Sequence, residues 1–205
     1  MSDRSAQVAG VLTGVVLLGA VAAFGIALPK ATGDDDTEAA SEIVLPDTLP
    51  HGLVAEDVAD EAGGPEAEEY AGRVAEIQTS AIDGLEEIFG APAAIRGYAS
   101  DDGSVQATVT VLDRAPGLFD PHGPPIDPEL LQLERSIYEL RRVGDAVCDL
   151  YWQQVVPEGQ PVDDAVAPSA VQCQLGDGDR TLELFGSGLT ADEAVEILES
   201  LTEDD

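Results

Sequence analysis

The chain has 205 residues, of which 41 are acidic and nine are basic, so its formal net charge at pH 7 is −32. Such a charge repels phosphate polymers and anionic lipid surfaces, which excludes nucleic-acid binding as a function. The length allows one domain with a sizeable core in addition to a membrane segment.

An uncharged run, 8–28, follows a short amino-terminal tail. At about 1.5 Å per residue, a helix of this length crosses the roughly 30 Å hydrocarbon core of a bilayer. The run is longer than the apolar region of a cleavable signal peptide, and only poor cleavage sites follow it. We therefore predict an uncleaved transmembrane helix over 8–28 with the tail 1–7 in the cytoplasm, and a removed signal peptide is the alternative.

Residues 29–65 separate this run from the domain. The stretch 31–42 is charged and aperiodic, which is typical of a solvated stalk. Residues 43–54 are too apolar for a free linker and contain two prolines. We predict that 29–65 is an acidic stalk whose apolar arm, 43–54, docks against the domain in an extended conformation.

The domain, 66–205, begins with a predicted helix. Apolar residues recur at steps of three and four over 66–89, and Gly90 ends the pattern. Two strands are predicted next, at 94–99 and 104–114, because apolar and polar residues alternate in the second of them. This alternation indicates an antiparallel sheet with one buried face and one solvent-exposed face.

A second helix is predicted after a loop at 115–126 that is rich in proline and glycine. Asp127 is a capping residue and Pro128 suits the first helical position. An apolar stripe then continues to Leu140, and Arg142 suits the negative end of the helix. We therefore predict a helix over this stretch.

Three more strands are predicted at 146–153, 170–175 and 180–185, the last two joined by a tight turn. Thr190 and Glu193 have the spacing of a capping box that opens a final helix. The predicted order is αββαβββα. This is an α+β fold in which about three helices cover one face of an antiparallel sheet.

Two cysteines, Cys148 and Cys173, lie in predicted strands. Each alternates with apolar residues, so both sulfur atoms are expected to point into the same core. We predict a disulfide between them, which indicates an oxidising compartment and an extracytoplasmic domain. Two buried thiols and a redox-active cysteine are the alternatives.

Patterns typical of catalysis are absent from the sequence: it has no nucleophile elbow, no phosphate-binding glycine loop and no EF-hand. His51 and His122 lack a second histidine at metal-ligand spacing. We expect no enzyme activity, no cofactor and no metal site. Calcium bound loosely at Asp34 to Asp36, or at Asp177 and Asp179, is the alternative.

These observations favour a single-pass cell-membrane protein, anchored in the lipid bilayer by 8–28, whose domain contacts another envelope or membrane protein. The candidate contact loop contains Phe119, Pro121 and His122, and an ordinary connecting loop is the alternative interpretation. Two other function classes remain open at this point. They are a ligand- or Ca²⁺-binding sensor and a secreted enzyme of unrecognised type.

Overall fold

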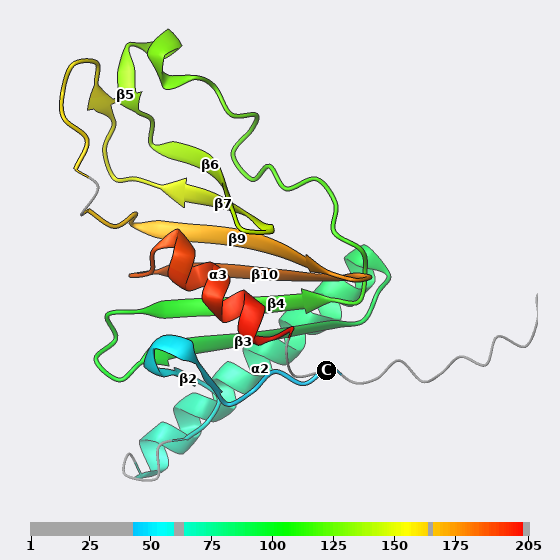
Figure 1. Cartoon of the computed structure of the whole chain (residues 1–205). Helices are drawn as coiled ribbons and strands as arrows, with labels where there is room; N and C mark the ends of the chain where they lie inside the picture. The colour runs from blue at the N-terminus through cyan, green and yellow to red at the C-terminus, as the bar shows by residue number, and fades with distance from the viewer. Residues whose placement is uncertain (1–42, 60–63, 164–165, 203–205) are drawn as a thin grey trace, which may run out of the picture. The chain divides into compact units, whose positions relative to one another are not determined.

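The computed structural model describes residues 43–59, 64–163 and 166–202. Its main element is an eight-stranded antiparallel sheet with the strand order β1-β2-β3-β4-β10-β9-β7-β6 (Figure 1). The α+β class is confirmed, with two α-helices in the described part of the chain. The tail 1–7 and the predicted membrane helix 8–28 lie outside these residues. No helix within them has the length and apolarity needed to span a bilayer.

The strands of the large sheet are β1 (Thr48–Leu49), β2 (Leu53–Ala55), β3 (Ala93–Ser100), β4 (Gln106–Leu112), β6 (Tyr138–Val143), β7 (Ala146–Tyr151), β9 (Ala170–Asp177) and β10 (Arg180–Ser187). A small sheet pairs β5 (Leu133–Arg135) with β8 (Val156–Pro157). The helices are α2 (Gly64–Phe89), α3 (Ala191–Ser200) and the 3-10 helices η1 (Pro50–Gly52) and η3 (Pro128–Leu131). The first and last predicted helices and all five predicted strands are therefore confirmed.

Tight turns join β3 to β4 and β9 to β10. In the first turn, Asp102 accepts hydrogen bonds from Ser104 Oγ at 2.6 Å, Ser104 N at 3.0 Å and Ser100 Oγ at 2.9 Å. These bonds favour the charged carboxylate and lower the pKa of Asp102 to about 2. In the second turn, Gly178 has a φ of +56°, which glycine adopts without a steric penalty.

One face of the sheet, which we call the inner face, carries the core. It is covered by α3 and by the segment 43–55. The predicted capping box opens α3: Glu193 N donates to Thr190 Oγ1, and the Glu193 carboxylate accepts from Thr190 N at 2.8 Å. The largest fully buried side chains are Leu53, Tyr98, Val109, Cys148, Leu150, Val171, Cys173, Leu184, Leu189, Ile197 and Leu198.

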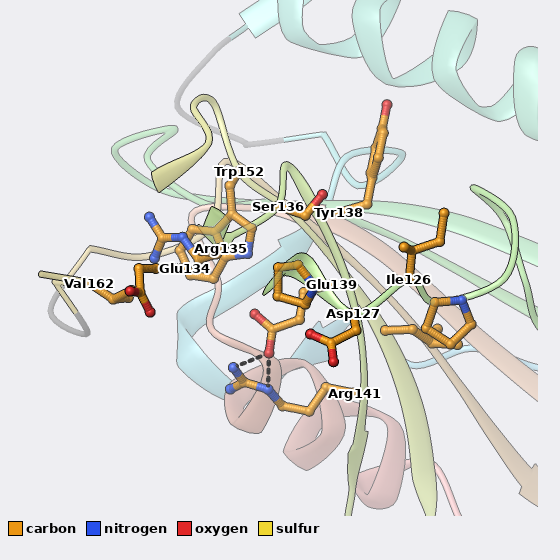
Figure 2. Close-up of a pocket in the computed structure, with 13 residues that line it drawn as sticks. Ile126, Asp127, Glu134, Arg135, Ser136, Tyr138, Glu139, Arg141, Trp152 and Val162 are labelled. Carbon is orange, nitrogen blue, oxygen red and sulfur yellow. Dashed lines mark hydrogen bonds and ion pairs between the residues drawn. The ribbon is translucent and has the colours of Figure 1, made fainter. Parts of the chain in front are cut away.

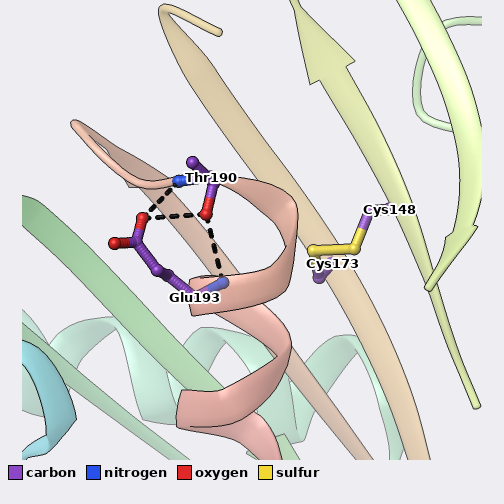
Figure 3. Close-up of a disulfide and its surroundings, with 4 residues drawn as sticks. All are labelled: Cys148, Cys173, Thr190 and Glu193. Carbon is purple, nitrogen blue, oxygen red and sulfur yellow. Dashed lines mark hydrogen bonds between the residues drawn. A yellow bond between two sulfur atoms is a disulfide. The ribbon is translucent and has the colours of Figure 1, made fainter. Parts of the chain in front are cut away.

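The predicted disulfide joins Cys148 of β7 to Cys173 of β9 in this core (Figure 3). The two residues are direct partners in the strand register, with their Cα atoms 4.0 Å apart. Both side chains are fully buried. The prediction from strand alternation is therefore confirmed.

The segment 43–55 extends the sheet at one edge, where β2 pairs with β3. The Tyr98 hydroxyl donates to Pro46 O at 2.8 Å, and burial raises the pKa of Tyr98 to about 12. Arg96 donates to Leu45 O at 2.7 Å and forms an ion pair with Asp47 at 2.9 Å. These contacts join the segment to the neighbouring strand by polar as well as apolar groups.

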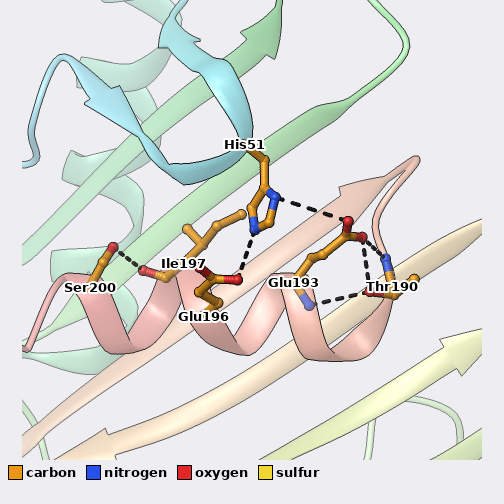
Figure 4. A network of polar contacts seen from close by, with 6 residues as sticks. All are labelled: His51, Thr190, Glu193, Glu196, Ile197 and Ser200. Atoms are coloured by element: carbon orange, nitrogen blue, oxygen red, sulfur yellow. Dashed lines mark hydrogen bonds and ion pairs between the residues drawn. The ribbon is translucent and has the colours of Figure 1, made fainter.

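A further contact links this segment to α3 (Figure 4). His51, in η1, lies with its Nε2 3.2 Å from Glu196 Oε2 and its Nδ1 4.0 Å from Glu193 Oε1. Hydrogen bonds from Thr190, and then the charge of His51, lower the pKa of Glu193. The segment 43–55 and α3 therefore share one polar cluster.

The two helices lie on opposite faces of the sheet, so the prediction that helices cover a single face is wrong (Figure 1). A Cβ atom added to Gly97 would lie 2.7 Å from Glu56 Oε2 and 3.8 Å from Gln78 Nε2, which belongs to α2. Gly97 alternates with the core residue Tyr98, so α2 packs on the other, outer face. Helical periodicity identifies the apolar side of a helix but does not say which face of a sheet it covers.

The predicted second helix is also wrong. Its start signals do work, because Asp127 accepts a hydrogen bond from Glu129 N at 3.0 Å, but Gln132 has a φ of 59° and ends η3. The chain then forms β5 and β6. Pairing of β6 with β7 satisfies backbone groups along the strand and overrides the helical spacing of the apolar residues.

Candidate functional site

The loop between β4 and β5 lines two large cavities. Its start is held on the β9–β10 hairpin, where Thr181 Oγ1 donates to Arg114 O at 2.7 Å. Pro116 packs so closely on Gly176 that an added Cβ would lie 2.7 Å from Pro116 Cγ. Glycine at 176 is therefore required for this close approach.

The first cavity, which we call the loop groove, has a volume of about 750 Å³ and lies on the outer face. Phe89 at the end of α2 and the loop residues 114–121 form its walls. Its floor comes from the outward-facing side chains of β9 and β10: Gln172, Gln174, Thr181 and Glu183. The groove thus opens where the outer face is not covered by α2.

Apolar side chains dominate the loop side of this groove. Leu118 is 93 % exposed, and Phe119 and Pro121 lie beside it in the lining. Asp120 lines both this groove and the small cavity beside His122, and its Oδ1 is buried and accepts no hydrogen bond from any described residue. The groove therefore combines exposed apolar surface with a buried, unpaired carboxylate oxygen in one of its lining residues.

The structure separates the three residues of the candidate contact loop. Phe119 and Pro121 line the loop groove, and Pro121 also lines the small cavity with His122, whose ring points to β6 and β7. His122 Nδ1 hydrogen-bonds Asp149 Oδ2, and the ring stacks on Tyr138 with centroids 3.9 Å apart. Asp149 is only 5 % exposed, so this contact supplies a buried carboxylate with a partner.

The His122–Asp149 pair corresponds to two of the three members of a Ser-His-Asp triad. Ser136 lines the same small cavity, of about 120 Å³, but makes no hydrogen bond to the His122 ring. Within the described residues, the pair fastens the loop to β7.

The second cavity, which we call the Arg–Trp pocket, has a volume of about 790 Å³ and lies beside β5 and β6 (Figure 2). The Arg135 guanidinium lies over the Trp152 ring, with its central carbon 3.7 Å from the ring centroid. Glu139 and Arg141 form an ion pair nearby, with Arg141 Nε 2.9 Å from Glu139 Oε1. Arg135 Nε and Trp152 Nε1 are both buried and have no acceptor in the described part of the chain.

Sequence reasoning did not find this pocket. The helix predicted after Asp127 includes Arg135, whereas the structure places this residue in β5, over the ring of the core residue Trp152. One signal was present, because three of the nine basic residues fall between 135 and 142 in a strongly acidic chain. The strand pairing that brings Arg135 over Trp152 is not visible from that signal.

Across residues 43–59, 64–163 and 166–202, no group of three or more histidine, cysteine, aspartate or glutamate side chains is arranged to hold a metal ion. Of the candidate calcium positions, Asp177 and Asp179 lie at the β9–β10 turn. Asp34 to Asp36 lie outside the described residues.

Comparison of the chain with protein-family models, with curated proteins and with solved structures finds no match. Its own residues are therefore the basis for assigning a function.

Proposed function

We propose that this chain is a membrane-anchored protein whose extracytoplasmic domain binds another membrane or envelope protein through the loop groove. The observation that carries the proposal is the position of Leu118, which stands 93 % exposed at a groove of about 750 Å³. Exposed apolar surface next to a concavity is typical of protein contact sites. The uncharged run 8–28 and the disulfide Cys148–Cys173 support the membrane location and the oxidising compartment.

The charge and the apolar lining of the groove indicate which residue types a partner should present. The chain carries a net charge of −32, which attracts basic surfaces and repels acidic ones. Among the charged residues that line the groove, the two carboxylates Asp120 and Glu183 outnumber the one cation, Arg114. We therefore expect a partner segment with apolar side chains flanked by lysine or arginine.

Site-specific cross-linking in intact cells tests this proposal. A photo-crosslinking amino acid replaces Leu118 in one strain and Ile77, an equally apolar residue exposed on α2, in a control strain. We expect a discrete cross-linked partner from position 118 alone, whose contact sequence is apolar and basic. Phe119→Ala and Asp120→Asn should each reduce its yield. Identical products from both positions, or yields unaffected by both variants, would contradict the proposal.

The location is tested separately. Protease added to intact cells should digest the domain if the domain lies outside the cytoplasm. Protection in intact cells with digestion after lysis would place the domain in the cytoplasm and overturn this part of the proposal.

A further inference from the structure

We infer that the Arg–Trp pocket binds a monocarboxylate carried on an apolar body. The pocket holds two hydrogen-bond donors that the described residues leave without acceptors, Arg135 Nε and Trp152 Nε1. Trp152 is 7 % exposed, so its indole N–H lies in a largely desolvated place. Buried polar groups of this kind are nearly always paired, and a ligand that brings acceptors would pair both.

The acidic residues of the pocket already have partners. Glu139 accepts from Arg141 Nε at 2.9 Å, and Glu134 Oε1 accepts from Gly159 N at 2.8 Å. Asp127 caps η3 through Glu129 N. Arg135, by contrast, lies over the Trp152 ring and, among the described residues, has no acceptor for its Nε. The pocket therefore presents a cation with a planar set of donors.

A planar guanidinium favours a planar anion. Arginine can bind a carboxylate through two parallel N–H···O bonds, and the contact with the Trp152 ring restricts where the Arg135 guanidinium lies. The chain's net charge of −32 also repels any anion that approaches the pocket. Because this repulsion grows with the charge of the ligand, a monocarboxylate is favoured over a phosphate or a dicarboxylate.

The remaining walls and the size of the pocket determine the rest of the ligand. Its apolar lining comes from Pro125, Ile126, Pro128, Leu140 and Val162. A volume of about 790 Å³ falls in the range of small-molecule sites and far exceeds a bare carboxylate. The apolar body can belong to a free organic acid or to the last residue of a peptide chain.

Fluorescence gives a site-specific measurement, because Trp152 is the single tryptophan of the chain. The full-length protein in nanodiscs of zwitterionic lipid is titrated with hexanoate and, in parallel, with the uncharged hexanamide. A second pair of probes is a short apolar peptide with a free carboxyl terminus and the same peptide amidated. We expect a saturable change in Trp152 fluorescence with the carboxylates and none with the amides.

Variants of the pocket separate charge from structure. Arg135→Gln should weaken carboxylate binding about tenfold or more, because the charge-assisted bonds are lost. Arg135→Lys, which keeps the charge but not the planar fork, should bind more weakly than the wild type and more tightly than Arg135→Gln. Arg142→Gln is the matched control: it removes the same charge from an exposed residue of β6 that does not line the pocket. It should bind as the wild type does.

The source of the carboxylate follows from the two probe pairs. Tighter binding of hexanoate points to a free organic acid, and tighter binding of the peptide points to a chain terminus. Equal responses to acid and amide, unchanged binding in Arg135→Gln, or no saturation would overturn the inference. This site does not depend on the loop groove, so Leu118→Ala should leave carboxylate binding unchanged.

Discussion

The two faces of the large sheet are built in different ways. The inner face is closed by α3, the segment 43–55 and a buried disulfide, and its side chains are almost all apolar. The outer face is covered in part by α2 and the loop, and it keeps polar groups such as Gln172 together with an exposed Phe185. The loop groove lies on this second face.

This difference separates stability from binding. Removing atoms from the inner face leaves cavities or unpaired polar groups, which is costly in a packed core. Removing exposed side chains from the outer face changes little in the folded state. Substitutions on the inner face should therefore mainly lower the free energy of unfolding. Substitutions on the outer face should mainly weaken binding.

The largest effect should come from the disulfide. Replacing both Cys148 and Cys173 by alanine should lower the free energy of unfolding by roughly 3 kcal/mol, because the bridge closes a loop with a sequence separation of 25. Denaturant unfolding measures this change, and wild-type protein in reductant should approach the variant. A loss below about 1 kcal/mol would show that the bridge contributes little to the inner face.

Next comes Tyr98→Phe, which leaves the Pro46 carbonyl without its donor and should cost about 1.5 kcal/mol. The pH dependence has a definite sign. Above the ordinary pKa of 10.0 the unfolded tyrosine ionises while the folded one stays neutral up to about 12, so wild-type stability falls over this range.

Denaturant unfolding at several alkaline pH values checks this prediction. The stability of Tyr98→Phe should fall less steeply with rising pH than that of the wild type, because the contribution from ionisation of Tyr98 is absent. Tyr151→Phe, which removes a hydroxyl from the outer face, should lose stability with rising pH as steeply as the wild type does. Equal alkaline slopes in the wild type and in Tyr98→Phe would contradict the assignment.

A smaller effect is expected at the start of α3. Thr190→Ala removes one half of the capping box and should cost about 1 kcal/mol at pH 7. The pKa of Glu193 is lowered in the folded state, so its stabilisation is present above its ordinary value of 4.5 and is lost as the pH falls through the lowered pKa. The difference between variant and wild type should shrink over that range.

Thermal unfolding as a function of pH measures this change. Thr79→Ala, a threonine within the exposed part of α2, is the control and should show no such pH dependence. A difference that persists unchanged into acid would mean that Glu193 does not take part in the cap.

The smallest effect on stability should come from the loop groove. Leu118→Ala should change the free energy of unfolding by less than about 0.5 kcal/mol, because the side chain is almost fully exposed. The same variant should weaken partner binding measured by pull-down from cross-linked cells. Strong destabilisation would show that Leu118 supports the fold, and the comparison of the two faces would then fail at this point.

Much of the fold was predictable where the local sequence pattern and the tertiary pairing favoured the same element. The alternation around Cys148 and Cys173 placed both sulfur atoms on one face and predicted their bridge, and the spacing from Thr190 to Glu193 predicted the last helix. The stretch after Asp127 was different. Its helix start was correct, but the apolar spacing fitted a helix and the backbone pairing with β7 required a strand.

The candidate sites were predictable only in part. Proline and glycine content identified a surface loop, and two of its three selected residues line the loop groove. The pairing of His122 with Asp149 and the contact of Arg135 with the Trp152 ring join residues that lie on different strands or loops. No local pattern specifies such contacts, because they depend on which strands become neighbours.

The sequence by itself determined the acidic charge, the anchor candidate, the periodicity of α2 and the side on which the predicted strands bury their apolar residues. These properties depend on neighbours within a few positions along the chain. Tertiary structure alone decided which face of the sheet each helix covers, that 138–143 forms a strand, and that two unpaired donors meet in one pocket of the described residues. Those outcomes depend on long-range pairing, which competes with local propensity and prevails in this protein.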